Sequence, residues 1–230
     1  APGKSAQSYS TVGSSVSVID SEDIKNSNEF FLGNVLDDNL PGMNYFRQGG
    51  HGAIMGIQLR GLPKRYSTIY IDGVKMSDPS TSDNSFYFSN IMNSSIDRIE
   101  ILRGSQSSLY GSSAIGGTIN IFTKKGKKGK TKDVEISSGS NGTKNINLSF
   151  GGANEKHNYF IGLNRFLTDG ISAMNDEPAT NDDDSYRNDG IVANYGCKIF
   201  ENLDFESGLR FSDSFLNYDR VKKTQTDLND

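Results

Sequence analysis

Apolar and polar residues alternate in short runs along most of the chain, and this period of two predicts strands rather than helices. In the first half the expected strands cover residues 16–19, 57–60, 67–74, 96–102 and 116–123. Ser21, followed by two acidic residues, marks the start of a short helix. A second helix is expected over residues 29–38, where apolar residues fall at helical spacing and Asn28 is placed to cap the first turn. We therefore expect a small mixed sheet with short helices.

Longer strands with two distinct faces are expected after residue 133. The clearest one places Leu203, Phe205, Leu209 and Phe211 on one face and Asp204, Glu206 and Arg210 on the other. Such a strand fits a membrane barrel, where the apolar face meets lipid, and also a soluble sandwich, where it meets a second sheet. Short turns at residues 152–156 and 200–202 alternate with a long loop at 169–190, an asymmetry typical of outer-membrane barrels. About five such strands fit in this stretch, too few to close a barrel, so we expect part of a longer protein.

Between these two regions, residues 124–132 interleave lysine with glycine. This composition predicts a flexible, solvated linker, and contact with phosphate or anionic lipid is the alternative. The expected organisation is therefore a flexible segment at 1–15, an α+β domain at 16–123, the linker at 124–132 and antiparallel barrel strands at 133–230.

Composition excludes several functional classes. Hydrophobic residues make up 34% of the chain, mean hydropathy is -0.55, and no run approaches the roughly 18 apolar residues of a membrane helix. The net charge of -4 does not favour a nucleic-acid partner. Cys197 is the only cysteine and there are two histidines, so the usual nucleophile and base sets are missing and we expect no enzyme.

Residues 96–125, IDRIEILRGSQSSLYGSSAIGGTINIFTKK, closely resemble the plug signature of TonB-dependent outer-membrane receptors. Four further pieces occur upstream in that family's order: VIDSEDI, LDDNLPGM, IQLRG and IYIDGV. Ser105 departs from the family pattern, which usually has proline there. The resemblance covers nearly the whole chain and implies an α+β plug followed by antiparallel transmembrane β-barrel strands, with the barrel incomplete in this chain.

The resemblance also implies a function. Such receptors lie in the outer membrane of Gram-negative cells, in contact with its lipid, and import a scarce nutrient with the help of a TonB-type energy-transducing protein. No covalent cofactor and no nucleic acid are expected. No convincing contact motif for the energy-transducing protein is found before Val16. A soluble β-rich binding or adhesion protein is the alternative from another class.

In this family the substrate binds between apical plug loops and external barrel loops. The plug loops here are residues 47–53 and 77–87, and the implied substrate contacts are Arg47, Gln48, Gly49, Gly50, His51, Ser77, Asp78, Ser82, Asn84 and Tyr87. Charged plug residues are expected to pair with the barrel wall. This set of plug–barrel ion pairs comprises Arg60, Glu100, Arg103 and Glu206.

Within the family, the barrel start most resembles the cobalamin (vitamin B12) receptors, and a ferric-siderophore or haem receptor is the alternative. The resemblance implies that acidic external loops bind Ca²⁺, a hard cation that takes six to eight oxygen ligands. The expected ligands are Asp176, Asp182, Asp183, Asp184, Asp189 and Asp219. Ser172 stands where the subfamily has its first acidic ligand.

Overall fold

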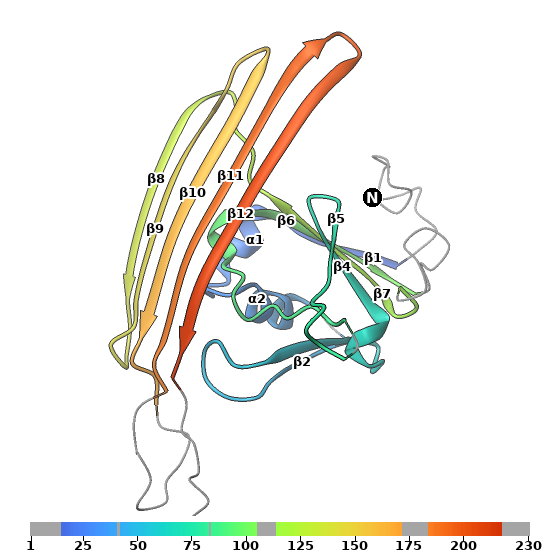
Figure 1. The fold of residues 1–230 in the computed structure, drawn as a ribbon, viewed down its shortest axis with the longest axis vertical. Helices are drawn as coiled ribbons and strands as arrows, with labels where there is room; N and C mark the ends of the chain where they lie inside the picture. Colours follow the sequence, from blue (N-terminus) through green and yellow to red (C-terminus); the bar gives the residue numbers. More distant parts are fainter. Residues whose placement is uncertain (1–14, 41, 83, 105–113, 172–183, 218–230) are drawn as a thin grey trace, which may run out of the picture.

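The computed structural model describes residues 15–40, 42–82, 84–104, 114–171 and 184–217, and it contains two five-stranded sheets. The first sheet has the order β1-β6-β7-β4-β5 and belongs to the unit that we call the plug. The second has the order β12-β11-β10-β9-β8, and we call it the wall. Figure 1 shows the wall as a tall curved sheet with the plug lying against its concave side.

The plug consists of short elements. Its strands are β1 (Ser15–Ile19), β2 (Met43–Arg47), β3 (Met55–Leu59), β4 (Ser67–Ile71), β5 (Val74–Met76), β6 (Ile96–Arg103) and β7 (Gly117–Thr123). Its helices are α1 (Ser21–Asn26), α2 (Leu32–Asn39) and the 3-10 turns η2 (Lys64–Tyr66) and η3 (Asn93–Ser95). β2 and β3 form a separate antiparallel hairpin. The α+β class predicted from the sequence is confirmed.

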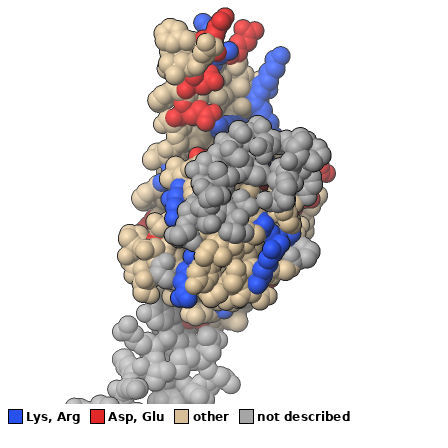
Figure 2. Space-filling model, turned by 90° about the vertical axis from the view of Figure 1, so that its right-hand side faces the viewer, with Lys and Arg blue, Asp and Glu red and all other residues tan. Residues whose placement is uncertain are grey.

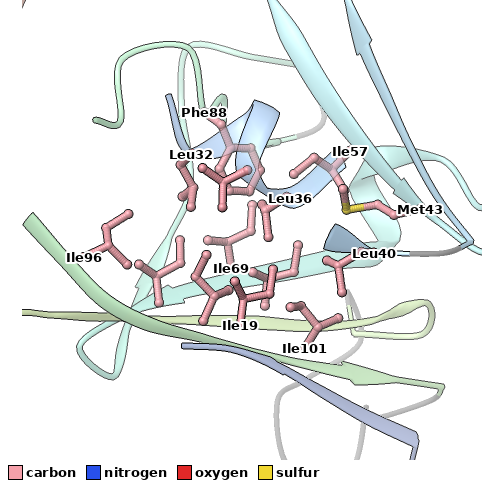
Figure 3. Close-up of a cluster of buried hydrophobic side chains, with 14 of the residues drawn as sticks. Ile19, Leu32, Leu36, Leu40, Met43, Ile57, Ile69, Phe88, Ile96 and Ile101 are labelled. Carbon is pink, nitrogen blue, oxygen red and sulfur yellow. The ribbon is translucent and has the colours of Figure 1, made fainter. Parts of the chain in front are cut away.

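One apolar core holds the plug together. Ile19, Ile69 and Ile101 of the sheet are buried together with Leu32 and Leu36 of α2 (Figure 3). Burying each such side chain contributes on the order of 1.5 to 3 kcal/mol. The sheet and helices therefore form one rigid support for the loops that leave it.

Two local expectations were wrong. α2 begins at Leu32 rather than at residue 29, because Asn28 has a left-handed backbone (φ 55°) and Phe31 takes the N-cap position without a side-chain hydrogen bond. The strand expected over 67–74 is broken into β4 and β5 by Asp72 and Gly73, whose φ angles are 48° and 84°. Two consecutive left-handed residues, with Asp-Gly as the sequence, are the usual solution for a tight hairpin turn.

The wall consists of β8 (Gly129–Ser138), β9 (Lys144–Ala153), β10 (His157–Thr168), β11 (Tyr186–Phe200) and β12 (Leu203–Leu216). Each strand is antiparallel to the next in the chain. Its outward face is apolar: Leu209 and Phe211 are 62% and 61% exposed. Seen from the plug side, acidic and basic side chains gather toward the end of the wall that carries the short turns (Figure 2). The strands do not close into a barrel, and no described helix is long and apolar enough to cross a membrane.

The linker expected at 124–132 ends early, because β8 already begins at Gly129 and pairs with β9. Gly126 lies so close to the carbonyl oxygens of Gly152 and Tyr159 that a Cβ there would overlap them. Glycine therefore serves close packing here rather than chain flexibility.

Candidate functional site between the plug and the wall

Both apical plug loops contribute to one pocket at the end of the wall that carries the long β10–β11 connection. The pocket holds about 400 Å³. Its lining from the plug is Gly52, Ile54, Ser77, Asp78, Pro79, Phe86, Tyr87, Ser89 and Asn90, and from the wall Tyr186, Ser214 and Leu216. We call it the outer pocket.

An aromatic cluster fixes the first plug loop against the wall. The His51 ring lies 5.2 Å from that of Phe31 and 5.1 Å from that of Phe166, measured between ring centroids. Phe31, Phe166 and Tyr186 are buried together with Met92. Burial, with a smaller effect of Arg47, lowers the pKa of His51 below its ordinary value of 6.5. The imidazole is therefore neutral at pH 7 and packs as an aromatic ring.

Gly52 is required beside this cluster for two reasons. Its φ of +79° is a conformation that other residues rarely adopt, and a Cβ at this position would overlap the Tyr186 ring. The absence of a side chain therefore lets the loop approach the wall closely.

The second plug segment is held to the wall through Asn90. The Tyr186 hydroxyl donates to Asn90 Oδ1 at 2.8 Å, and Asn188 Nδ2 donates to the Asn90 carbonyl at 3.2 Å. On the plug side, Lys64 Nζ donates to the Tyr87 hydroxyl at 2.6 Å. Residues 86–90 are therefore fixed at both ends.

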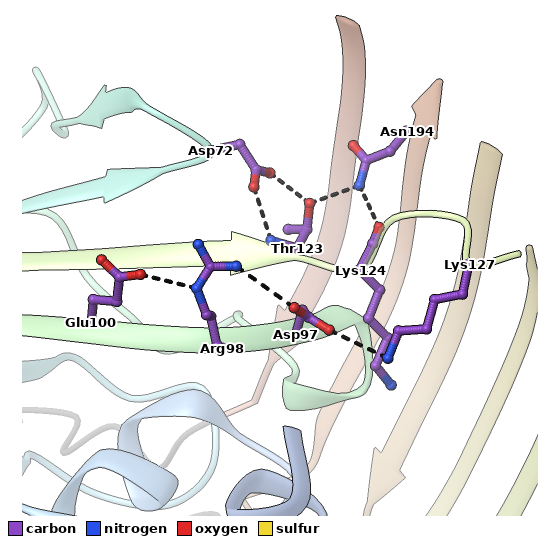
Figure 4. A network of polar contacts seen from close by, with 8 residues as sticks. All are labelled: Asp72, Asp97, Arg98, Glu100, Thr123, Lys124, Lys127 and Asn194. Carbon is purple, nitrogen blue, oxygen red and sulfur yellow. Dashed lines mark hydrogen bonds and ion pairs between the residues drawn. The ribbon is translucent and has the colours of Figure 1, made fainter. Parts of the chain in front are cut away.

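A polar network joins plug and wall at the opposite end of the interface (Figure 4). The Asp72 carboxylate accepts from the Thr123 amide at 2.9 Å and from its hydroxyl at 2.6 Å. Asn194 Nδ2 of the wall donates to Thr123 Oγ1 at 2.7 Å and to the Lys124 carbonyl at 2.8 Å. Arg210 of β12 lies 3.7 Å from Asp72. The tight turn between β4 and β5 therefore places one carboxylate where β7 leaves the plug.

The lysines that follow β7 are engaged, contrary to the expectation of a solvated hinge. Lys124 Nζ donates to the Ser94 carbonyl at 2.8 Å, and its burial lowers the pKa of its amine. Lys125 Nζ lies 2.5 Å from Glu206 Oε1, and Lys127 Nζ lies 3.9 Å from Asp97. Ser94 and Asp97 of the plug and Glu206 of the wall each face one of these lysines, whereas Lys128 and Lys130 are exposed.

The ion pairs expected between plug and wall are only partly found. Glu206 pairs with Lys125, but Glu100 pairs with Arg98 of its own strand at 2.9 Å. Arg103 ends β6 opposite Gly117, whereas Ile96 at the other end of β6 lies opposite Thr123. Seven strand steps of about 3.3 Å separate these ends by roughly 23 Å. Arg60 lies beside Gly104, next to Arg103, so neither arginine is placed to pair with Glu206.

The expected substrate contacts divide into three groups. Ser77, Asp78 and Tyr87 line the outer pocket. His51 lies in the aromatic cluster next to it. Outside the pocket lining are Arg47, Gln48, Gly49, Gly50, Ser82 and Asn84.

Sequence reasoning missed the wall's contribution to the pocket. Tyr186 and Ser214 reach it because β11 pairs with β12 in a register that sets Tyr186 opposite Leu216. Asn90 lies in an irregular segment with no periodic pattern. The sequence placed Tyr186 inside the long loop expected at 169–190, whereas β11 already begins at Tyr186.

Most of the expected calcium ligands lie outside the described residues: Asp176, Asp182, Asp183 and Asp219. Asp184 is buried. Asp189 lies 3.6 Å from Arg165 and 3.4 Å from Arg187, so two cations already face its carboxylate. Within the described part of the chain, no cluster of three or more His, Cys, Asp or Glu residues is present.

Comparison with known proteins shows what this chain is similar to. The family model of the TonB-dependent Receptor Plug Domain matches residues 8–118. The chain is 33% identical over 205 residues to the vitamin B12 transporter BtuB of Photobacterium profundum, covering 89% of this chain and 33% of the relative. The corresponding transporter of Vibrio cholerae serotype O1 is 27% identical over 95% of the chain and 36% of its own length. The chain thus spans about a third of the length of these relatives.

Solved structures share the fold. The ferric yersiniabactin uptake receptor FyuA from Yersinia pestis matches with a TM-score of 0.67 and 23% identity, over 90% of this chain and 32% of that one. The ferripyoverdine receptor of the outer membrane of Pseudomonas aeruginosa matches with a TM-score of 0.73 and 15% identity, over 90% of this chain and 26% of that one. These relatives are transporters and receptors rather than enzymes. The plug-domain match over residues 8–118, together with a mixed sheet set against antiparallel wall strands, shows that the chain carries the plug domain of the TonB-dependent receptors.

Proposed function

We propose that this protein is an outer-membrane receptor of a Gram-negative cell that binds a scarce nutrient on its external side and imports it with a TonB-type energy-transducing protein. The observation that carries the proposal is the outer pocket, to which both apical plug loops and the ends of β11 and β12 contribute. Because the outer pocket is lined by both the plug and the wall, any movement of one unit relative to the other changes its shape. Binding at such a site is therefore suited to start a plug movement.

The outward face of the wall supports a membrane location. From Leu203 to Phe211 its apolar residues run for eight strand steps, about 26 Å at roughly 3.3 Å per residue. At a strand tilt of about 45° this covers about 19 Å of the roughly 25 Å apolar band of outer-membrane barrels. Toward the long loop the band meets a row of ion pairs, in which Arg187 contacts Asp189 at 3.4 Å and Asp213 at 3.2 Å, and the exposed Phe215 lies beyond this row. An apolar band bounded by ions matches a membrane edge.

For the nutrient we propose cobalamin. The support is sequence similarity: the vitamin B12 transporter of P. profundum is 33% identical over 89% of this chain. The siderophore receptors match at 15–23% sequence identity. Similarity at this level shows a shared fold but does not indicate a shared substrate. A ferric siderophore is the competing ligand in the test below.

The test is a binding measurement on the receptor expressed from its complete reading frame. Radiolabelled cyanocobalamin is titrated onto the purified receptor, with a ferric siderophore and haem as competitors. Saturable cobalamin binding that neither competitor displaces is expected. Strong ferric-siderophore or haem binding with none for cobalamin would reject the proposed substrate and keep the receptor class.

We further propose that the acidic loop after β10 binds Ca²⁺ beside the nutrient. Carboxylates about 4 Å apart repel each other by about 4 kcal/mol near a protein surface, and a hard cation offsets that repulsion. Chelation with EGTA should weaken cobalamin binding, and added Ca²⁺, but not Mg²⁺, should restore it. Binding that is unchanged by EGTA would reject the calcium site.

A further inference from the structure

A second cavity lies deeper between the plug and the wall. It holds about 630 Å³ and runs along the inner face of β11 and β12, opposite β5 and the segment that follows it. We call it the inner cavity. It extends to Glu206 and Lys125, at the end of the interface opposite the outer pocket.

The two spaces meet at one plug segment. Phe86, Tyr87 and Asn90 line both the outer pocket and the inner cavity. On the wall, Ser212 lines the inner cavity and Ser214, the next inward-facing residue of β12, lines the outer pocket. Residues 86–90 therefore form the partition between them.

The inner cavity has a distinct chemistry on each side. The plug side carries the apolar residues Val74, Met76 and Ile91 together with the polar residues Asp72, Asn90 and Ser95. The wall side carries the amides of Asn158, Asn164 and Asn194.

The charged groups of the inner cavity are already paired. Lys125 lies 2.5 Å from Glu206, and Arg210 lies 3.7 Å from Asp72. Paired charges offer little to an ionic ligand, whereas an amide provides donors and an acceptor. Asn194 already donates to Thr123 and Lys124, which leaves its carbonyl oxygen as an acceptor. Asn164 Nδ2 is buried with no hydrogen-bond partner among the described residues. The lining therefore suits a neutral solute that carries amide or hydroxyl groups beside an apolar surface.

We propose that the inner cavity is a transit site, in which the imported nutrient is held by the wall's asparagine amides after it passes the 86–90 partition. This inference rests on the proposed import function and adds a route and a ligand class to it. The neutral, amide-bearing chemistry of the lining favours a corrinoid, with its ring of carboxamide side chains, over a charged iron chelate. A whole corrinoid is larger than the 630 Å³ cavity, so the plug must also move away from the wall as the ligand enters. Passage requires residues 86–90 to separate from β11, where two hydrogen bonds to Asn90 hold them.

The experiment compares single cysteines in the receptor whose native cysteines are replaced by serine. Ser212→Cys and Ser214→Cys change one atom each and lie two residues apart on the same face of β12. A receptor that retains only Cys197, an outward position by the alternation of β11, is the matched control. Each is treated with a bulky methanethiosulfonate, labelling is measured by mass, and cyanocobalamin binding and cellular uptake are then recorded.

The inference predicts that labelled Ser212→Cys binds cobalamin within about twofold of the unlabelled receptor and loses uptake. Labelled Ser214→Cys should lose binding by about tenfold or more. Labelled Cys197 should behave as the untreated receptor. Normal uptake by labelled Ser212→Cys, or failure of that cysteine to react at all, would overturn the transit site.

A second pair of variants tests the ligand chemistry. Asn164→Asp places a charge on the amide wall, whereas Asn164→Gln keeps the amide. We expect slower uptake with unchanged equilibrium binding for the first and near-normal uptake for the second. Equal uptake by both variants would contradict the role of the amides. If the unmodified receptor neither binds nor imports cobalamin, the proposed function fails instead, so the two failures are distinguishable.

Discussion

Individual residues at the outer pocket act through shape as much as through polarity. Gly52 and His51 are adjacent in the first plug loop. Gly52 leaves space for the Tyr186 ring, and the His51 ring packs against Phe166 of the wall. From the sequence, a histidine in a glycine-rich loop indicated a polar contact with substrate. Its aromatic neighbours, Phe31 and Phe166, come from segments far away in the chain, and local pattern does not report such contacts.

At Gly52, substitution by alanine should displace the loop, because the added Cβ meets Tyr186 and the left-handed backbone becomes strained. We expect nutrient affinity to fall by about tenfold, on the basis of roughly 1 to 3 kcal/mol of strain. Gly50→Ala in the same loop is the matched control, since nothing lies within 4 Å of a Cβ there. Equal affinities of the two variants, measured by titration, would show that the close approach has no role.

His51 should make binding sensitive to acid. Its pKa is lowered by burial and by Arg47, so a detached loop takes up a proton more readily than the packed one. The packing is fully present above the ordinary pKa of 6.5 and weakens as the pH falls below it.

Binding measured between about pH 7.5 and pH 5 should therefore weaken toward the acid end. His51→Phe keeps an aromatic ring but does not titrate, so binding by this variant should change less over the same pH range. An unchanged profile in this variant would assign the pH dependence to other groups.

At the scale of elements, the sequence was most informative for strands that have one apolar face and one polar face. The alternation of Leu203, Phe205, Leu209 and Phe211 correctly predicted β12 and its outward face. The break between β4 and β5 was missed, although Asp72 and Gly73 form a known turn pair. The Lys-Gly segment was misjudged because its partners, Glu206 and Asp97, are set by tertiary packing.

The turn between β4 and β5 joins the plug to the wall through Asp72. Asp72→Asn keeps a residue that tolerates the left-handed turn but loses the charge that faces Arg210 and Thr123. Asp72 is partly exposed, so we expect a modest loss of about 1 to 2 kcal/mol, below the upper end for charged hydrogen bonds.

The measurement for Asp72→Asn is the thermal unfolding midpoint of the purified receptor. Asp213→Asn, which removes an exposed ion pair with Arg187, is the control and should change stability by less than about 0.5 kcal/mol. Identical midpoints for the two variants would mean that the Asp72 network does not couple plug and wall.

At the scale of the whole molecule, the surfaces of the plug and the wall explain how the two units are arranged in space. The plug buries its own core, whereas the wall exposes apolar residues on one side and amides and charges on the other. In the proposed membrane location, lipid on the outward side and the plug on the inward side satisfy both faces. Outer pocket, partition and inner cavity then follow one another along the inner face of β12.

The central claim is energised import, and uptake of radiolabelled cyanocobalamin tests it most directly. The complete receptor is expressed as the only route for cobalamin in cells that have or lack the energy-transducing protein. We predict surface binding in both strains and accumulation only where that protein is present. Equal accumulation in the two strains, or no binding in either, would contradict the account.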